Sequence, residues 1–156
     1  MLDAVAEAGL PAGVIVTGPE GATFAEGWTR LVNPRPEDGL GSSLALAARD
    51  ALERGQESLL VLLADMPLVT ADYLRELAAF PAPSATRQPD GHAGVPALFD
   101  RSLLEQAAVL TGDRGAGPLL RGAMRFDPPA GMLRDVDTPE DLRAVERALT
   151  SIPSRE

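Results

Sequence analysis

The sequence contains no cysteine, no lysine and only one histidine. Without cysteine the chain has no disulfide bonds, no thiolate nucleophile and no cysteine-ligated zinc. A single histidine also excludes a metal site built from several imidazoles. Aromatic residues make up only 4% of the 156 positions. Any chemistry therefore has to come from carboxylates, arginine, hydroxyl groups and the backbone.

Positive charge is scarce as well. The chain has 23 acidic residues against 14 basic ones, all of them arginine, and a net charge of −9. An acidic chain without a basic cluster argues against nucleic acid or an anionic membrane as a partner. It does not exclude nucleotides, because aspartate contacts phosphate groups through Mg²⁺.

Long apolar runs are absent too. The longest covers residues 59–64 and is far too short to span a bilayer, and residues 1–9 lack the basic region of a signal peptide. We therefore expect a cytoplasmic protein. Its length and its 45% hydrophobic content suit one domain over residues 1–150. Residues 151–156 are expected to form a disordered tail.

Strand and helix patterns alternate along the chain. Strands are expected at 13–17, 30–33, 58–64, 124–126 and 133–136, and helices at 2–8, 44–54, 71–79, 101–108, 116–122 and from 138. This alternation is typical of an α/β domain with a mostly parallel sheet, whose ligands bind at the carboxyl ends of the strands.

Two segments bear on where those strands lie. The run 58–64 is apolar throughout, which is the pattern of a central parallel strand covered on both faces. Residues 81–94 are rich in proline, glycine and polar residues and predict a loop with at most a short strand. Pro96 predicts that residues 95–99 form an edge strand or the start of a strand.

Carboxylates follow two of the expected strands. Asp65 comes directly after the run 58–64, where a carboxylate suits Mg²⁺, or else stabilises the turn. Asp135 and Asp137 flank Val136 and project to the same side of the last strand. Together with Asp65 they could hold one Mg²⁺ and a triphosphate, although Asp137 could instead assist the cap of the following helix. We expect Asp65 and Asp137 at the same sheet edge.

The segment Gly39-Leu-Gly-Ser-Ser43 is expected to form the loop before a helix N-terminus, on the same side as Asp65. Its backbone N–H groups and hydroxyls suit an anion, which the helix dipole also favours. Alternatively Ser42 or Ser43 serves only as a helix cap. Residues 111–115 carry an aspartate and an arginine, and we expect them to form a solvated turn. We expect His92 to be a surface residue.

Six segments in order carry a resemblance to a known family. They are Leu31-Val-Asn-Pro34, Gly39-Leu-Gly-Ser-Ser-Leu44, Leu62-Leu-Ala-Asp-Met-Pro67, Gly94-Val-Pro-Ala-Leu-Phe99, Gly112-Asp-Arg-Gly-Ala116 and Asp135-Val-Asp-Thr-Pro-Glu-Asp-Leu142. Their order resembles the molybdenum cofactor nucleotidyltransferases, which are MobA-like NTP transferases with a three-layer, Rossmann-like (GT-A-type) fold. The second segment looks like the branch that transfers CMP from CTP to molybdopterin and releases pyrophosphate.

The resemblance implies roles for particular residues. It implies that Asp65 and Asp137 are catalytic and bind Mg²⁺. It assigns the nucleotide to Gly39, Gly41, Ser42, Ser43 and Asp65, and the pterin substrate to Gly94, Pro96, Asp113 and Arg114. A guanylyltransferase or another small-molecule nucleotidyltransferase remains an alternative, as does an inactive domain that binds a partner or a pterin without transfer.

One feature of the family is missing. Its members open with a strand and a glycine-rich loop, Leu-Ala-Ala-Gly-x-Ser-x-Arg-x-Gly, followed by a lysine. The present chain begins with residues that match the helix after that loop. We therefore expect a domain without its first strand–loop unit, with negligible transferase activity of its own. We also expect unpaired strand edges, which favour self-association.

Overall fold

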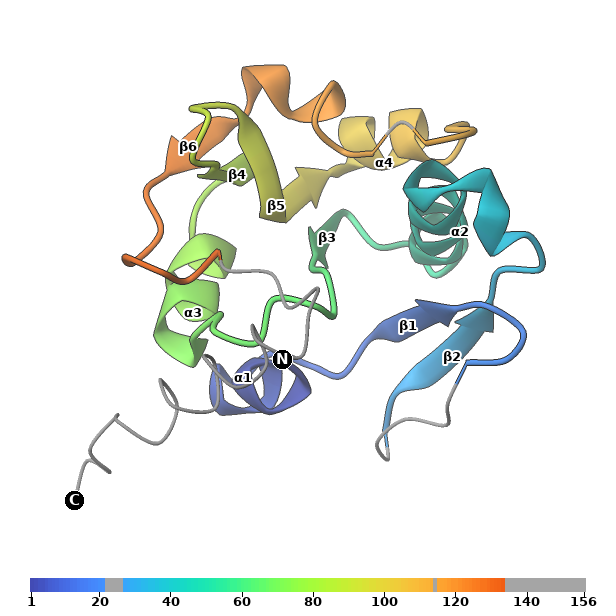
Figure 1. The fold of residues 1–156 in the computed structure, drawn as a ribbon, viewed down its shortest axis with the longest axis horizontal. Coiled ribbons are helices and arrows are strands. Elements are labelled where there is room, and N and C mark those ends of the chain that lie inside the picture. The colour runs from blue at the N-terminus through green and yellow to red at the C-terminus, as the bar shows by residue number, and fades with distance from the viewer. Residues whose placement is uncertain (22–26, 114, 134–156) are drawn as a thin grey trace.

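The computed structural model describes residues 1–21, 27–113 and 115–133, and Figure 1 shows helices and strands alternating along them. In chain order the elements are α1 (Leu2–Glu7), β1 (Val14–Thr17), β2 (Thr29–Val32), the 3₁₀ turn η1 (Pro36–Asp38), α2 (Leu40–Glu53), β3 (Ser58–Val61), α3 (Ala71–Ala79), β4 (Ser84–Arg87), β5 (Ala93–Asp100), α4 (Arg101–Ala107), the 3₁₀ turn η2 (Leu119–Gly122) and β6 (Met124–Phe126). The expected α/β class is confirmed. The end of the strand expected at 133–136 and the helix expected from 138 lie outside the described residues.

The strands form two sheets with mixed pairing. β1 and β2 make a parallel pair, and a second sheet has the order β3-β5-β4-β6. In that sheet β4 and β6 are parallel, while β5 runs antiparallel to both β3 and β4. The sheets are thus mixed rather than mostly parallel, because β4 and β5 are joined by a tight turn and form a hairpin.

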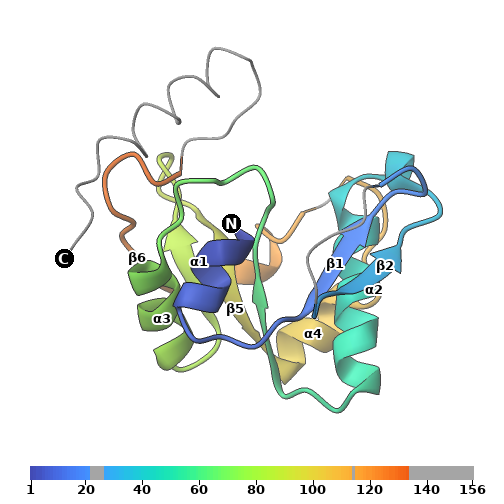
Figure 2. The same cartoon turned by 90° about the horizontal axis from the view of Figure 1, so that it is seen from below.

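Two neighbouring strand edges are unpaired among the described residues. β1 pairs only with β2, and β3 pairs only with β5. Both views place β1 next to β3, yet no ladder joins them (Figures 1 and 2).

β5, rather than β3, is the buried strand. The prediction of a central parallel strand over 58–64 was wrong: β3 ends at Val61, runs antiparallel to β5 and is only half-buried. In β5, by contrast, Ala97 and Phe99 have no exposed surface. The apolar pattern of 58–64 alone could not distinguish a central strand from a half-covered one.

Pro96 lies inside β5, not at an edge. The register between β4 and β5 shifts between Ala85, which faces Ala97, and Thr86, which faces Gly94. Two residues of β5 therefore face no partner of their own on β4. Proline is tolerated at such a bulge because its missing N–H is not needed there.

Helices cover both faces of the larger sheet. α2 and α4 pack on one face around Ala48, Leu104 and Phe99, and α1 and α3 pack on the other around Val5 and Leu74. Figure 2 shows the resulting three layers, with α1 and α3 on one side and α2 and α4 on the other. Within the described ranges no helix is long and apolar enough to cross a membrane.

Candidate functional site

The amino end of α2 is shaped by Gly39. This residue is the N-cap, with φ +88° and ψ 179°, a conformation that is essentially restricted to glycine. The helix begins at Leu40, so Gly41, Ser42 and Ser43 lie in its first turn and not in a preceding loop as expected. The first N–H groups of a helix have no partner within it and favour an anion.

Asn33 ties the end of β2 to this first turn. Its side chain is 5% exposed, and its Nδ2 donates to Ser42 Oγ at 2.8 Å and to Ser43 Oγ at 3.1 Å. The Oδ1 atom accepts from the backbone N–H of Arg35. Ser42 in turn donates its hydroxyl hydrogen to the carbonyl of Gly39 at 2.8 Å. Every polar group of the Asn33 amide is therefore used to hold the turn in place.

Ser43 differs from Ser42 in one respect. Among the described residues the Ser43 hydroxyl only accepts a hydrogen bond, from Asn33. A hydroxyl has one hydrogen to donate as well. The Ser43 O–H is therefore a donor that a bound phosphate oxygen can use.

Sequence analysis did not single out Asn33. It lies directly after β2, which is the same position relative to a strand that directed attention to Asp65. The rule that ligands bind at the carboxyl ends of strands applies equally to it.

Asp113 packs against Gly39. A β-carbon on Gly39 would lie 2.8 Å from the Cα and 2.9 Å from the Cγ of Asp113, and would overlap its Oδ1. The structure thus brings together a residue assigned to the nucleotide and one assigned to the pterin side. A carboxylate at the amino end of the 14-residue α2 is favoured by the helix dipole.

A cavity of about 210 Å³ adjoins this turn. Its walls come from the segment 33–38, from α2 and from residues 110–112, with Asn33 and Ser42 among its lining residues. The amino end of α2 therefore opens on a space that can admit a small group.

Asp65 lies in the exposed segment between β3 and α3. Figure 2 shows this segment at the same end of the molecule as the amino end of α2. Within the described residues no group of three or more histidine or carboxylate side chains is placed to hold a metal ion. Asp65 is thus a single hard oxygen ligand, which fits Mg²⁺ shared with substrate phosphates and water. Asp135, Asp137 and Arg114 lie outside the described residues.

Gly94 and Pro96 belong to the β4–β5 hairpin. A β-carbon on Gly94 would lie 2.7 Å from the flexible side chain of Gln88, which would have to move to admit it. Pro96 is fully buried, and its carbonyl accepts from the Thr86 hydroxyl at 2.7 Å. Both residues therefore shape the hairpin, and neither presents a polar side chain to a ligand.

The family model of the MobA-like NTP transferase domain matches residues 1–128. This chain belongs to the MobA-like NTP transferase family. The recognition made from the six segments is confirmed at that level, although nothing specific singles out the cytidylyltransferase branch. The match ends before Asp135 and Asp137, so it leaves their roles untested.

Two curated members of known name are similar to the chain. The purine catabolism protein PucB of Bacillus subtilis is 32% identical over 81% of this chain and 65% of its own length. The phosphoenolpyruvate guanylyltransferase of Sphaerobacter thermophilus is 34% identical over 69% of this chain and 56% of its own length. The matches thus span less than two thirds of both relatives.

Solved structures support the Rossmann-like fold. Rv0371c from Mycobacterium tuberculosis aligns with a TM-score of 0.69 and 25% identity, covering 97% of this chain and 82% of that protein. A structure of the same protein in complex with manganese aligns with a TM-score of 0.72 at 24% identity, covering 92% and 82%. The three-layer fold expected for a MobA-like NTP transferase is therefore confirmed.

Proposed function

We propose that this domain belongs to a nucleotidyltransferase that moves CMP from CTP to molybdopterin and releases pyrophosphate. The observation that carries the proposal is the first turn of α2. There Asn33 holds two serine hydroxyls beside backbone N–H groups at an end of the molecule that also presents Asp65. Such a turn suits a phosphate group, and the carboxylate suits the metal ion that accompanies a nucleoside triphosphate.

In this reaction a phosphate oxygen of the acceptor attacks the α-phosphorus of CTP. A new P–O bond forms, the bond between the α-phosphorus and the bridging oxygen breaks, and that oxygen leaves with pyrophosphate. The protein's contribution is to position the two anions and to offset their charge. Ser43 and the N–H groups of residues 40 and 41 donate hydrogen bonds to phosphate oxygens, and Asn33 orients the Ser43 hydroxyl.

Asp65 is our proposed metal ligand, with Asp137 as the second carboxylate. Bound Mg²⁺ supplies charge neutralisation at the triphosphate. The manganese bound by Rv0371c supports divalent metal use in a protein of the same fold. We place the activity in the cytoplasm, where nucleoside triphosphates are available.

Guanylyl transfer is the second candidate. The relative from Sphaerobacter thermophilus is a phosphoenolpyruvate guanylyltransferase, and it is as similar to this chain as PucB is. The CTP preference rests on the resemblance of Gly39-Leu-Gly-Ser-Ser-Leu44 to the cytidylyltransferase branch. The test therefore varies the base of the nucleotide and the identity of the acceptor independently.

The glycine-rich loop bears on the activity of the chain itself. The 156 residues contain no such loop and no lysine. Each preorganised donor at a reacting group is worth on the order of 3 kcal/mol in the transition state, so losing several removes most of the rate. We expect negligible turnover by this chain alone, and turnover by a version extended with a strand and glycine-rich loop that pair with β1 and β3.

The test measures pyrophosphate release by both versions. CTP and GTP are each supplied with molybdopterin or phosphoenolpyruvate, in Mg²⁺, in Mn²⁺ and after metal removal. Release only from the extended version, with CTP, molybdopterin and metal, supports the proposal. Release with GTP and phosphoenolpyruvate favours the second candidate, and equal turnover by both versions contradicts the role of the loop.

The Asp65→Asn variant tests the metal ligand. It should lose most of the metal-dependent turnover of the extended version. Glu57→Gln is the matched control, because Glu57 precedes the other end of β3 and its carboxylate is exposed in an ion pair with Arg101. Equal activity of both variants would remove Asp65 from the metal site.

A further inference from the structure

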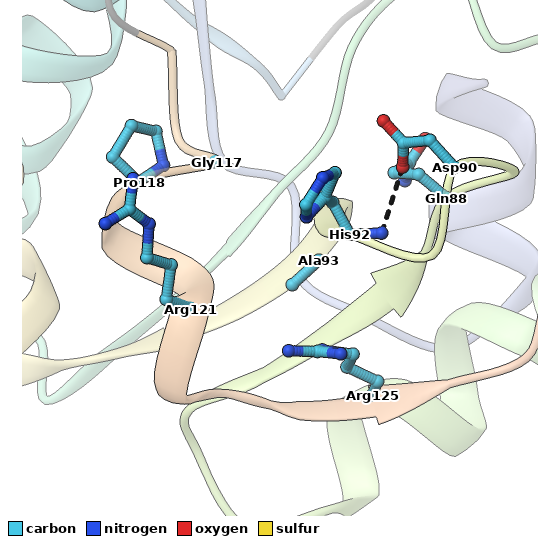
Figure 3. A pocket seen from close by; sticks show the side chains of 8 residues that line it. All are labelled: Gln88, Asp90, His92, Ala93, Gly117, Pro118, Arg121 and Arg125. Carbon is cyan, nitrogen blue, oxygen red and sulfur yellow. Dashed lines mark hydrogen bonds between the residues drawn. The ribbon is translucent and has the colours of Figure 1, made fainter.

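A second and larger cavity, of about 400 Å³, lies between the turn joining β4 and β5, η2 and β6. Figure 3 shows the eight residues that line it: Gln88, Asp90, His92, Ala93, Gly117, Pro118, Arg121 and Arg125. None of these residues belongs to α2 or to the segment that carries Asp65. The cavity is therefore separate from the first turn of α2.

The lining of this cavity is cationic in a chain whose net charge is −9. Arg121, Arg125 and His92 come from three different segments and surround the small side chain of Ala93 (Figure 3). The only carboxylate in the lining is Asp90, and its Oδ1 accepts from the backbone N–H of His92 at 2.9 Å. That carboxylate is thus engaged within the turn instead of neutralising either guanidinium.

The guanidinium groups of Arg121 and Arg125 have no carboxylate partner among the described residues. Five other described arginines pair with acid: Arg35 with Asp38, Arg54 with Asp50, Arg75 with Asp72, Arg87 with Asp127, and Arg101 with Glu57. Arg30 and Arg49 donate to backbone carbonyls instead. Among the described residues Arg121 makes no ion pair or side-chain hydrogen bond, and Arg125 makes only one bond of 3.4 Å to the Gly91 carbonyl. Their forked donors are free to bind an anion.

We propose that this cavity is a binding site for a phosphate dianion. Two guanidinium forks and an imidazole on different sides match a tetrahedral anion with several acceptor oxygens, whereas one fork suffices for a planar carboxylate. The volume leaves room for an organic group attached to the phosphate. Figure 2 shows the β4–β5 turn at the same end as the amino end of α2.

Resting on the proposed function, we assign this phosphate to the acceptor and not to the nucleotide. The nucleotide site uses donors on α2, and the present cavity uses none of them. The acceptor phosphate thus meets its own guanidinium groups on η2 and β6 and an imidazole on the β4–β5 turn.

Inorganic phosphate is the probe for the site. His92 is the only histidine, so the C2 proton of its ring gives a single NMR signal that reports on the cavity. Phosphate titrated into the chain should shift this signal with saturation, and calorimetry should give the same dissociation constant. Arg121→Gln and Arg125→Gln should each weaken binding about tenfold or more, and the double variant should abolish it.

Arg54→Gln and Arg75→Gln are the matched controls, because each removes an exposed guanidinium that is paired within its own helix. Both should bind phosphate like the parent chain. A phosphate affinity that is unchanged in the Arg121 and Arg125 variants, or that falls equally in the controls, would overturn the site. Thermal unfolding of each variant shows that its fold is retained.

The affinity for CTP distinguishes the phosphate site proposed here from the proposed nucleotide site. If the phosphate belongs to the acceptor, Arg121→Gln and Arg125→Gln leave the affinity for CTP with Mg²⁺ unchanged and, in the extended version, raise the KM for the acceptor. Weaker CTP binding in these variants would overturn the assignment to the acceptor. Phosphate binding that depends on both arginines, together with an extended version that transfers no nucleotide, would leave this site standing while the proposed function fails.

Discussion

The Oδ1 atom of Asp113 occupies the space that a β-carbon on Gly39 would need. The loop after α4 is thereby held against the amino end of α2, although the two segments are far apart in the sequence. Gly39 is required for two independent reasons, its backbone conformation and this close approach. The relationship links the α2 turn of the proposed nucleotide site to the Asp113 loop.

Replacing Gly39 by alanine should destabilise the domain more than replacing Gly55. Gly55 has φ +72° with nothing within 4 Å of its added β-carbon, so Gly55→Ala costs only backbone strain, about 1 kcal/mol. Gly39→Ala adds a clash with Asp113 to a strain of about 1–3 kcal/mol. Urea unfolding of both variants measures the difference. Equal losses of stability would mean that the Asp113 loop moves away freely.

Asn33→Ala and Ser43→Ala should separate stability from binding. Asn33→Ala leaves two half-buried hydroxyls without their donor and should lower the free energy of unfolding by about 1–3 kcal/mol. Ser43→Ala removes a hydroxyl from the first turn of α2 and should affect stability less, while weakening the binding of CTP. Chemical unfolding and CTP titration check the two effects. Full CTP affinity in Ser43→Ala would contradict the proposed phosphate contact.

Tyr73 should make the stability of the domain sensitive to alkaline pH. Burial raises the pKa of the Tyr73 hydroxyl, which donates a hydrogen bond to Thr86 Oγ1 at 2.8 Å. Because the folded state holds this proton more tightly, its contribution is complete below the ordinary pKa of about 10 and is lost as the pH rises through the raised pKa. Tyr73→Phe should lack this loss.

Tyr73 is the only tyrosine, so its ultraviolet absorbance reports its ionisation directly. Unfolding measured at several alkaline pH values in both proteins completes the test. A parent chain that loses no more stability than Tyr73→Phe above the ordinary pKa would contradict the expectation.

Two neighbouring hydroxyls on β4 should respond in opposite directions. Ser84 and Thr86 are both fully buried, but the Ser84 Oγ has no hydrogen-bond partner among the described residues. Ser84→Ala removes a desolvated group and should stabilise the domain by about 1 kcal/mol. Thr86→Val breaks the bonds with Tyr73 and with the Pro96 carbonyl and should destabilise it by about 2 kcal/mol. A loss of stability in Ser84→Ala would point to a partner for that hydroxyl.

The sequence by itself determined the class of the fold, most elements and the family. The helix α3 is an example, since it covers the expected residues 71–79 and Thr70 caps it by accepting from the Tyr73 N–H. Such signals act within a few residues and are therefore readable in sequence. The six ordered segments likewise indicate a MobA-like NTP transferase.

Tertiary structure decided which strand is central and which side chains meet. Only the pairing of β5 with both β3 and β4 shows that Pro96 lies at an interior bulge, and only packing places Asp113 against Gly39. The convergence of Arg121, Arg125 and His92 on one cavity is of the same kind. These contacts join segments distant in sequence, and no local propensity specifies the partner, because that choice depends on how the whole core is packed.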